Sequence, residues 1–171
     1  LELAGKVPIL GICGGYQMLG KRLLDPHGIE DPSIKEMDGL GLLDMDTYWD
    51  SDEKVTTRNA ATFIRTGEKV KGYQIHMAQS NVRGRPLFDI DGEDEGCCDD
   101  DNMVYGTYLH GVLEAPAFRK FFLNLIKPGL AKESSESDYS LNVELEVARV
   151  SAKIKDSLDM DLFSKLFLEV E

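Results

Sequence analysis

Residues 7–19 read VPILGICGGYQML, and this stretch decides the fold class. Residues 7–12 form a short run without a polar side chain, which is typical of a buried strand of a parallel sheet. Residues 16–23 then have the apolar spacing of a helix. A strand, a glycine-rich turn and a helix in this order predict an α/β fold, with the turn at the carboxyl end of a sheet strand.

Cys13 stands in this turn with glycines on both sides of it. A thiol is an effective nucleophile when it is exposed and partly ionised, and the N–H groups at the start of a helix favour the thiolate. The glycines permit a tight turn and let a substrate approach the backbone, and the N–H of Gly14 is placed to donate to a developing oxyanion. We therefore interpret Cys13 as a nucleophile, the alternative being a buried structural cysteine.

A thiol nucleophile needs a base, and the chain has three histidines. His27 stands in a polar loop, and His76 lies within an alternating, strand-like segment. Residues 104–111 are predicted to form a strand that ends in a glycine turn, and His110 stands before that glycine in the run Tyr108-Leu109-His110-Gly111. This is a usual place for a site residue at the end of a strand. We expect His110 to be the base, and we expect His76 to be a hydrogen-bonded structural histidine.

The rest of the chain alternates strand-like and helical patterns, with one polar stretch near its end. Residues 131–140 are polar and low in complexity, which predicts a surface loop. Residues 141–171 have the apolar spacing of C-terminal helices, so we expect residues 1–171 to form one, N-terminally incomplete domain. The further expectations are a loop over 25–39, strands over 54–64 and 70–77, acidic turns over 89–102 and a helix over 115–126.

Composition argues against several kinds of partner. The net charge of −12 leaves no basic excess for nucleic acid or for an anionic membrane. The sequence contains no apolar run of membrane-spanning length and no secretory signal. The spacing of Cys13, Cys97 and Cys98 does not suggest zinc. We expect no metal, a reducing cytoplasmic setting, and a structural role for Cys97 and Cys98.

Three segments together resemble class I glutamine amidotransferases. Residues 11–20, GICGGYQMLG, resemble their nucleophile motif G-x-C-x-G-x-Q, and the variant Cys-Gly-Gly-Tyr-Gln is typical of the cobyric acid synthase branch. Residues 72–77, GYQIHM, and residues 106–111, GTYLHG, agree with that branch in order and character, as do residues 157–161 near the end. Three ordered motifs around a thiol and a histidine are a specific signal.

The resemblance implies a class I glutamine amidotransferase (flavodoxin-like) architecture, with a partly parallel sheet flanked by helices. In that branch, an N-terminal synthetase domain uses ATP and Mg²⁺ to activate carboxylates of cobyrinic acid a,c-diamide, and a C-terminal domain hydrolyses glutamine to supply ammonia. The chain resembles the later part of that C-terminal domain. We therefore expect its first strands and the synthetase domain to be missing, glutamine to bind here, and ATP, Mg²⁺ and the corrinoid acceptor to bind through the synthetase domain.

The resemblance also implies roles for single residues. Cys13 attacks the glutamine amide, Gly14 and Gly15 belong to the oxyanion turn, and His110 protonates ammonia and activates water. Gln17 is a candidate for contacting glutamine, its alternative being a helix residue that satisfies local backbone groups. Arg58 is a candidate for the glutamine α-carboxylate because guanidinium matches that geometry, its alternative being a surface arginine.

The sequence departs from the general pattern at one important position. Most class I amidotransferases have a glutamate two residues after the histidine, where this chain has Val112, and Glu114 follows two residues later. We therefore expect a Cys-His dyad whose orienting partner the sequence does not reveal. The branch often has glutamate where this chain has Gln74, which argues against a polar role there. Two alternatives stay open: a glutaminase subunit acting on lipid II peptide stems, and a non-catalytic domain of the same fold.

Overall fold

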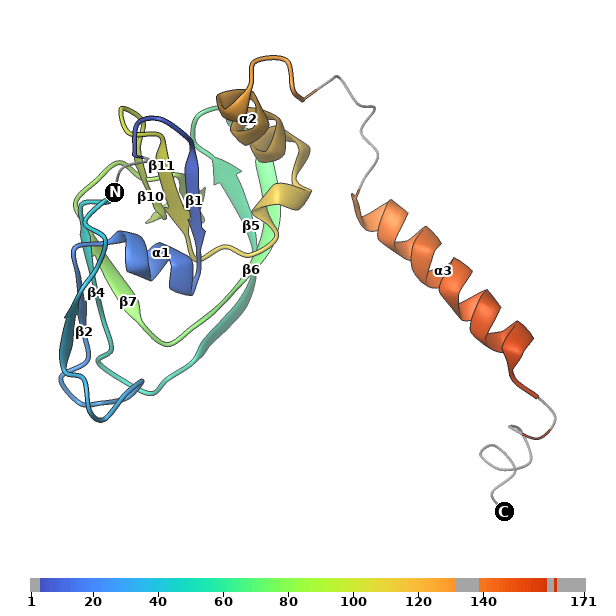
Figure 1. Ribbon diagram of the computed structural model, residues 1–171, viewed down its shortest axis with the longest axis horizontal. Helices are drawn as coiled ribbons and strands as arrows, with labels where there is room; N and C mark the ends of the chain where they lie inside the picture. The colour runs from blue at the N-terminus through green and yellow to red at the C-terminus, as the bar shows by residue number, and fades with distance from the viewer. Residues whose placement is uncertain (1–3, 132–138, 160–161, 163–171) are drawn as a thin grey trace. The chain divides into compact units, whose positions relative to one another are not determined.

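The computed structural model describes residues 4–131, 139–159 and 162, and the chain divides into two compact units, residues 1–133 and 134–171 (Figure 1). The first unit combines three small sheets with short helices, which confirms the mixed α/β fold class. The second unit contains helix α3 (Tyr139–Ser157). In the described part of the chain, every helix is too short or too polar to cross a bilayer.

The central sheet of the first unit has the strand order β1-β11-β10. Strands β1 (Ile9–Ile12) and β11 (Val104–Thr107) run parallel, with Ile12 opposite Thr107, and β10 (Cys97–Asp99) pairs with β11 in the antiparallel sense. Helix α1 (Gly14–Leu19) follows β1 directly. The strand, turn and helix predicted from residues 7–19 are therefore present, and the parallel pair places the ends of β1 and β11 at the same edge.

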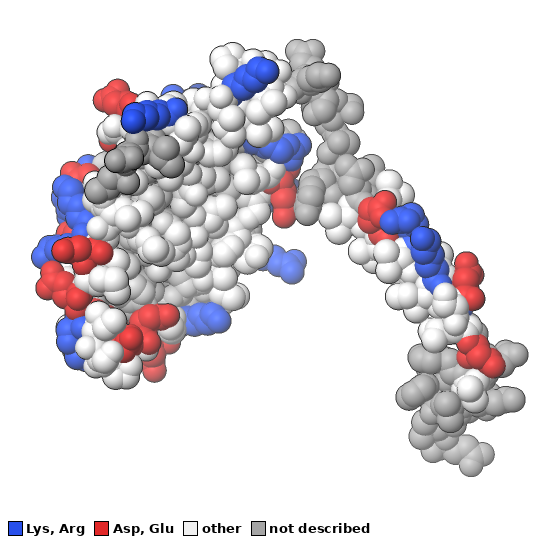
Figure 2. Space-filling view, in the orientation of Figure 1, with Lys and Arg blue, Asp and Glu red and all other residues white. Residues whose placement is uncertain are grey.

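A second sheet has the order β3-β2-β4-β7, and its strand β2 follows α1 directly in the chain. Strands β2 and β4 are parallel, and the other two pairs are antiparallel. The bounds of its strands are β2 (Arg22–Leu24), β3 (Glu36–Asp38), β4 (Met45–Tyr48) and β7 (Gln79–Val82). The surface over β2 and β4 carries mixed acidic and basic side chains (Figure 2), where Arg22 and Arg83 both pair with Asp46.

The third sheet is built on a long hairpin and has the order β6-β5-β8-β9. All of its pairs are antiparallel. Its strands are β5 (Val55–Phe63), β6 (Lys69–His76), β8 (Phe88–Ile90) and β9 (Glu93–Glu95). The end of β6 reaches the segment that follows β11, because Tyr73 and His110 form an isolated bridge. This bridge joins the hairpin to the edge at which β1 and β11 end.

Two helical elements follow β11, and the second of them completes the larger core. They are the 3₁₀ turn η1 (Val112–Glu114) and helix α2 (Pro116–Ile126). Phe118 of α2 is fully buried and packs edge-on against Phe63 with ring centroids 5.3 Å apart, and its ring lies the same distance from Phe88. Aromatic rings in such a cluster bury large areas in favourable geometry. Helix α2 therefore packs against β5 and β8 through Phe118.

Several predicted boundaries were wrong. The helix expected over 16–23 spans Gly14–Leu19 only, because Gly20 is extended and a Cβ atom there would lie 2.8 Å from the carbonyl oxygen of Met45. The chain after Gly20 continues as strand β2, not as helix. The acidic stretch 89–102, expected to form turns, carries strands β9 and β10. Runs of Asp, Glu and Gly have low strand propensity, but pairing with β8 and β11 overrides it.

The C-terminal predictions are only partly covered by the described residues. The helix expected from residue 141 begins at Tyr139 and ends at Ser157. Residues 132–138, in the predicted surface loop, and 160–161 and 163–171, in the second predicted helix, lie outside the described residues. The assignment of residues 1–171 to one domain stays a prediction.

Candidate active site

Cys13 sits at a strained turn between β1 and α1. Its backbone has φ 54° and ψ −116°, a conformation that residues with a Cβ atom rarely adopt. The Cys13 N–H donates to the carbonyl of Thr107 at 2.9 Å, and the carbonyl of Cys13 accepts from the N–H of Gln17 at 3.1 Å. Strain of this kind persists only where the surroundings enforce it, and it clusters at functional sites.

Glycines on both sides of α1 make this turn possible. A Cβ atom on Gly11 would lie 2.5 Å from Cδ1 of Leu19 and 2.7 Å from the carbonyl oxygen of Gly15. A Cβ atom on Gly106 would lie 2.1 Å from the ring of Tyr16. The helix therefore packs directly onto the backbones of β1 and β11, and this close packing holds the Cys13 turn against the sheet edge.

The thiol of Cys13 is half-buried and points at the end of strand β6. Its Sγ atom donates a long hydrogen bond, 3.6 Å, to the carbonyl oxygen of Ile75. Gly14 and Gly15, the first two residues of α1, are exposed beside it. The first N–H groups of a helix have no partner within the helix, so the Gly14 N–H is available to an oxyanion beside the thiol.

His110 is fixed to the same strand by both its backbone and its ring. Its N–H donates to the carbonyl of Tyr73 at 2.8 Å, and its carbonyl accepts from the Tyr73 N–H at 3.3 Å. Its imidazole stacks on the Tyr73 phenol. Residues two apart in a strand face the same side. Cys13, at Ile75, and His110, at Tyr73, are thus brought to neighbouring positions on one strand end.

The ring nitrogen Nε2 of His110 is buried without a hydrogen-bond partner among the described residues. The thiol of Cys13 bonds to Ile75 instead, and no hydrogen bond joins it to His110 in the described part of the chain. Catalytic hydrogen bonds are often long before substrate binds and tighten afterwards. The imidazole nitrogen of His110, which has no described partner, is therefore suited to exchange a proton with an incoming group.

Gly72 lets the His110 segment lie across β6. A Cβ atom on Gly72 would lie 2.4 Å from the carbonyl oxygen of His110 and 2.7 Å from the side chain of Leu109. Any larger residue would push that segment outward. Gly72, the first residue of the GYQIHM motif, is therefore needed to keep the His110 segment in its position.

Gln17 projects from α1 toward Tyr108, the residue two before His110. The Tyr108 hydroxyl hydrogen-bonds to Ser80 Oγ at 2.8 Å, and the Gln17 side chain lies close enough to this hydroxyl to act on its pKa. Burial raises the pKa of Tyr108, so the hydroxyl stays protonated at neutral pH. Gln17 therefore belongs to a polar network that lines the Cys13 turn, while direct contact with glutamine stays a prediction.

Arg58 lies on the same hairpin as the site. It is directly opposite Tyr73 in the β5–β6 register, and opposite residues of an antiparallel pair lie on one face about 4.5–5.5 Å apart. Arg58 is exposed and forms no ion pair with the described residues. A guanidinium next to the stacking partner of His110 is suitably placed to receive a carboxylate.

His76 makes the structural contacts expected of it. Its Nδ1 atom lies 2.7 Å from the carbonyl oxygen of Ala78, and its ring stacks on Tyr108 with centroids 3.9 Å apart. Burial is the main cause that lowers the pKa of His76, so the neutral ring predominates at neutral pH. His27, the third histidine, is exposed in a turn.

Cys97 and Cys98 are buried neighbours on β10, and their side chains pack in two different hydrophobic clusters. Cys97 packs in the cluster of Tyr16 and Leu19, and Cys98 packs in the cluster of the phenylalanines. Burial raises the pKa of the Cys97 thiol to about 11 and raises that of Cys98 as well. Buried, protonated thiols are poor nucleophiles, which favours the structural role predicted for them.

Two residues stand at or near the position where most class I amidotransferases have their third catalytic residue, namely Val112 and Glu114. Neither forms a described hydrogen bond with the His110 ring. Val112 is fully buried in the core. Glu114 ends η1, where its N–H donates to the Gly111 carbonyl at 2.8 Å. The acidic residue that does approach this segment is Glu95 on β9, which is 8% exposed and accepts from the Tyr108 N–H at 2.7 Å. The sequence pattern missed it because it lies within an acidic stretch that predicts surface turns.

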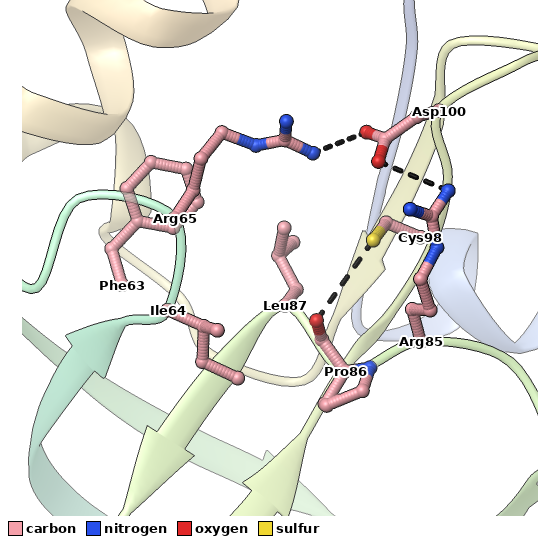
Figure 3. A pocket seen from close by; sticks show the side chains of 8 residues that line it. All are labelled: Phe63, Ile64, Arg65, Arg85, Pro86, Leu87, Cys98 and Asp100. Carbon is pink, nitrogen blue, oxygen red and sulfur yellow. Dashed lines mark hydrogen bonds and ion pairs between the residues drawn. The ribbon is translucent and has the colours of Figure 1, made fainter.

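Two hollows in the surface lie away from Cys13. One, of about 340 Å³, is drawn in Figure 3, where Arg65 and Arg85 both pair with Asp100 above an apolar floor. The other, of about 370 Å³, lies across the Arg85–Pro86 segment. Neither is lined by Cys13 or His110. Across the described part of the chain, no group of three or more His, Cys, Asp or Glu side chains is placed to hold a metal ion.

The strained thiol turn and its neighbouring histidine define a glutamine amidotransferase type of site, and comparison with known proteins agrees. Residues 2–118 match the CobB/CobQ-like glutamine amidotransferase domain family, and the chain belongs to this family. Over 98% of its length it is 42% identical to a probable cobyric acid synthase of Methanococcoides burtonii. It is also 40% identical to the cobyric acid synthase of Rhodobacter capsulatus over 89% of its length, and 38% identical to that of Brucella melitensis over 90%. The chain spans about a third of the length of these relatives (34%, 31% and 31%).

Proposed function

We propose that the chain is the glutamine-hydrolysing domain of a cobyric acid synthase, which supplies ammonia for ATP-dependent amidation of corrinoid carboxylates. The observation that carries the proposal is that Cys13, held in a strained turn, contacts Ile75, and that His110 pairs with Tyr73, two residues away on β6. The names of the similar proteins support the corrinoid acceptor. The acceptor, ATP and Mg²⁺ bind outside the site described here, in a cytoplasmic setting that keeps the thiols reduced.

The proposed reaction has two stages. In the first, Cys13 transfers its proton to His110, and the thiolate attacks the side-chain carbonyl carbon of glutamine. The Gly14 N–H donates to the oxyanion, and the C–N bond breaks as His110 returns the proton to the leaving ammonia. In the second stage, His110 takes a proton from water, and the resulting hydroxide attacks the γ-glutamyl thioester. The C–S bond breaks to release glutamate, and His110 returns the proton to the leaving Cys13 sulfur.

Two side chains are proposed to hold glutamine for this reaction. Arg58 binds the α-carboxylate, because it is exposed beside the His110–Tyr73 pair and unpaired with any described acid. Gln17 contacts the substrate amide from the Tyr108 network. Gly15 keeps the turn open above the thiol, since nothing lies within 4 Å of where its Cβ atom would be.

The test is replacement of Cys13 by alanine in the full-length protein. We expect Cys13→Ala to abolish glutamine hydrolysis and glutamine-dependent amidation, and to leave amidation with added ammonium salt unchanged. Cys97→Ala is the matched thiol control and keeps both activities, because that thiol is buried and protonated. A Cys13→Ala protein that still used glutamine would refute the proposal.

The same preparations separate the two alternatives. A non-catalytic domain would leave Cys13 unlabelled by a glutamine-like electrophile, whereas the proposal expects rapid labelling that glutamine blocks. Amidation of a corrinoid acid but not of a lipid II peptide stem is the result expected for the proposed acceptor. The reverse preference would replace the acceptor and keep the glutaminase chemistry.

A further inference from the structure

We propose that Glu95 is a positioning residue for glutamine hydrolysis, which holds His110 in place through the backbone of residues 107–109. The inference rests on the proposed function, because it assigns a role within that same site. It concerns how His110 is oriented in a chain that has Val112 where most class I amidotransferases have an orienting glutamate. Glu95 stands on β9, twelve residues before the segment that it binds.

The Glu95 carboxylate collects the polar groups that lead up to His110. Its Oε1 atom accepts from the Tyr108 N–H at 2.7 Å, and its Oε2 atom accepts from the Thr107 hydroxyl at 2.6 Å. The Thr107 hydroxyl oxygen in turn accepts from the Leu109 N–H at 2.9 Å. One carboxylate, helped by one hydroxyl, therefore fixes consecutive residues up to the one before His110.

These contacts replace a strand partner at the point where the sheet stops. Strand β10 pairs with β11 only as far as Cys97 opposite Gly106. Gly96, with φ +73°, turns the chain away there, and a Cβ atom on it would lie 2.5 Å from the Gly106 carbonyl oxygen. Beyond that point the Tyr108 N–H has no β10 carbonyl to bond to. The Glu95 side chain takes that place, so the path toward His110 is defined although the ladder has ended.

The same carboxylate faces the strand that holds the other half of the site. The Gln74 side chain lies close enough to the Glu95 carboxylate to act on its pKa, in the direction that lowers it. Gln74 lies between Tyr73, which stacks on His110, and Ile75, whose carbonyl accepts from Cys13. Glu95 thus lies near both the segment that carries His110 and strand β6, whose residues Tyr73 and Ile75 contact His110 and Cys13.

A buried carboxylate such as that of Glu95 requires partners that compensate for its loss of water. A carboxylate that leaves water without a partner is strongly disfavoured, and Glu95 has no lysine or arginine partner among the described ion pairs. Burial is the largest influence on the pKa of Glu95 and raises it, while the hydrogen bonds from the Thr107 hydroxyl and the Tyr108 N–H act to lower it. Both of these groups donate, and an ionised carboxylate only accepts. A glutamine side chain has the same shape but would turn its NH₂ group toward one of those donors. The site is therefore matched to an acid, not to an amide.

Three variants of the full-length protein test this role. Glu95→Gln removes the charge and one acceptor, and Thr107→Val removes the bridging hydroxyl at nearly constant shape. Thr107→Ser keeps the hydroxyl and serves as the conservative control. Each is assayed for glutamine hydrolysis without acceptor, giving kcat and KM, and for amidation with ammonium salt, with Cys13→Ala measured in parallel.

We expect Glu95→Gln and Thr107→Val to lower kcat by about 10- to 100-fold, because a shift of about 1 Å in a reacting group can cost that much. We expect KM for glutamine and the ammonia-dependent rate to stay near the parent values, and Thr107→Ser to restore kcat. Parent-like kcat in Glu95→Gln and Thr107→Val, with Cys13→Ala inactive, would refute the inference and leave the proposed function standing. An equal loss of kcat and of ammonia-dependent activity would also refute it, in favour of a general structural role.

The remaining outcomes are also decisive. If Glu95→Gln does not fold, the contrast between Thr107→Val and Thr107→Ser still measures the hydroxyl bridge to Leu109. If Cys13→Ala continues to hydrolyse glutamine, the proposed function fails, and the positioning role fails with it. The two failures are distinguishable because only the second changes the Cys13 result.

Discussion

The imidazole of His110 lies flat against the phenol of Tyr73, with ring centroids 4.8 Å apart and an angle of 6° between the planes. The backbones of the same two residues exchange both of their hydrogen bonds. Together these contacts fix the position of the His110 backbone and the plane of its imidazole ring. In a site without a described carboxylate on the ring, an exposed tyrosine therefore does part of the orienting.

Replacing Tyr73 tests this contribution of the ring stack. Tyr73→Phe keeps the aromatic face, and we expect it to hydrolyse glutamine at the parent rate. Tyr73→Ala removes the face and is expected to lower kcat about 2- to 12-fold, because an aromatic pair is worth about 0.5–1.5 kcal/mol. Tyr73 is 49% exposed, so its loss should change the free energy of unfolding little. Equal kcat in the two variants would contradict the role of the stack.

Gly72→Ala should displace His110 by crowding its backbone carbonyl. The new Cβ atom would meet the His110 carbonyl at 2.4 Å, so the segment must move outward. We expect kcat to fall by up to about 100-fold and the protein to lose about 1–3 kcal/mol of stability through overpacking. Steady-state glutamine hydrolysis and urea unfolding measure the two effects. Lys71→Ala, at the exposed neighbouring position on β6, is the control and should leave both unchanged.

The local parts of the site were predictable from the sequence, since each depends on a short pattern. An apolar run, a Gly-Ile-Cys-Gly-Gly turn and a helix suffice to place Cys13 at a strand end, and a histidine before glycine suffices to single out His110. The structure confirms the placement of Cys13, whereas β11 ends at Thr107 and His110 follows three residues later in an isolated bridge to Tyr73. The catalytic roles of both residues stay a proposal. Short patterns succeed here because the parallel pair β1–β11 aligns the two strand ends without help from the rest of the chain.

The contribution of β6 and β9 could not be predicted in the same way. Nothing local marks Tyr73 as the partner of His110, because that bridge depends on how the β5–β6 hairpin docks on the sheet. Glu95 is still less visible, since its neighbours Glu93 and Asp94 are exposed acids of the same composition. Only the turn at Gly96 separates the buried carboxylate from the surface ones. Long-range placement, which the sequence pattern does not encode, decides the difference.

Arg58→Ala should weaken binding of glutamine without slowing the chemistry. A charge-assisted hydrogen bond to the α-carboxylate is worth about 1.5–3 kcal/mol, so we expect KM for glutamine to rise about tenfold or more. The kcat should stay near the parent value, because such a contact serves substrate and transition state alike. Arg85→Ala is the matched control, since Arg85 is also exposed but lines the hollow of Figure 3. A parent-like KM in Arg58→Ala would assign Arg58 to the surface.

Alkylation should distinguish the three thiols of the native protein. Iodoacetamide at neutral pH is expected to modify Cys13, which is half-buried at a helix start, and to spare Cys97 and Cys98. The pKa of Cys97 is raised to about 11, so its thiolate is scarce at neutral pH. Peptide mass spectrometry before and after unfolding in urea measures the three sites. Early modification of Cys97 or Cys98 would show that β10 opens in the native state.

The last prediction concerns Asp100, whose pKa is lowered chiefly by a hydrogen bond from Arg65. Arg85 and the Tyr105 hydroxyl add to this effect, while burial opposes it. Because the folded pKa lies below the ordinary value of 3.8, Asp100 stabilises the fold above about pH 4, and this contribution is lost as the pH falls through the folded pKa. We expect Asp100→Asn to cost about 1–3 kcal/mol at pH 7.

Urea unfolding of the parent and of Asp100→Asn from neutral to acidic pH tests the sign. The difference in unfolding free energy should be constant between about pH 5 and 7 and should shrink toward zero below about pH 3. Asp52→Asn is the control, because Asp52 is exposed and forms no ion pair with the described residues. Its difference from the parent should be small at every pH. A difference for Asp100→Asn that stayed constant into acid would show that the lost stability comes from packing and not from the carboxylate charge.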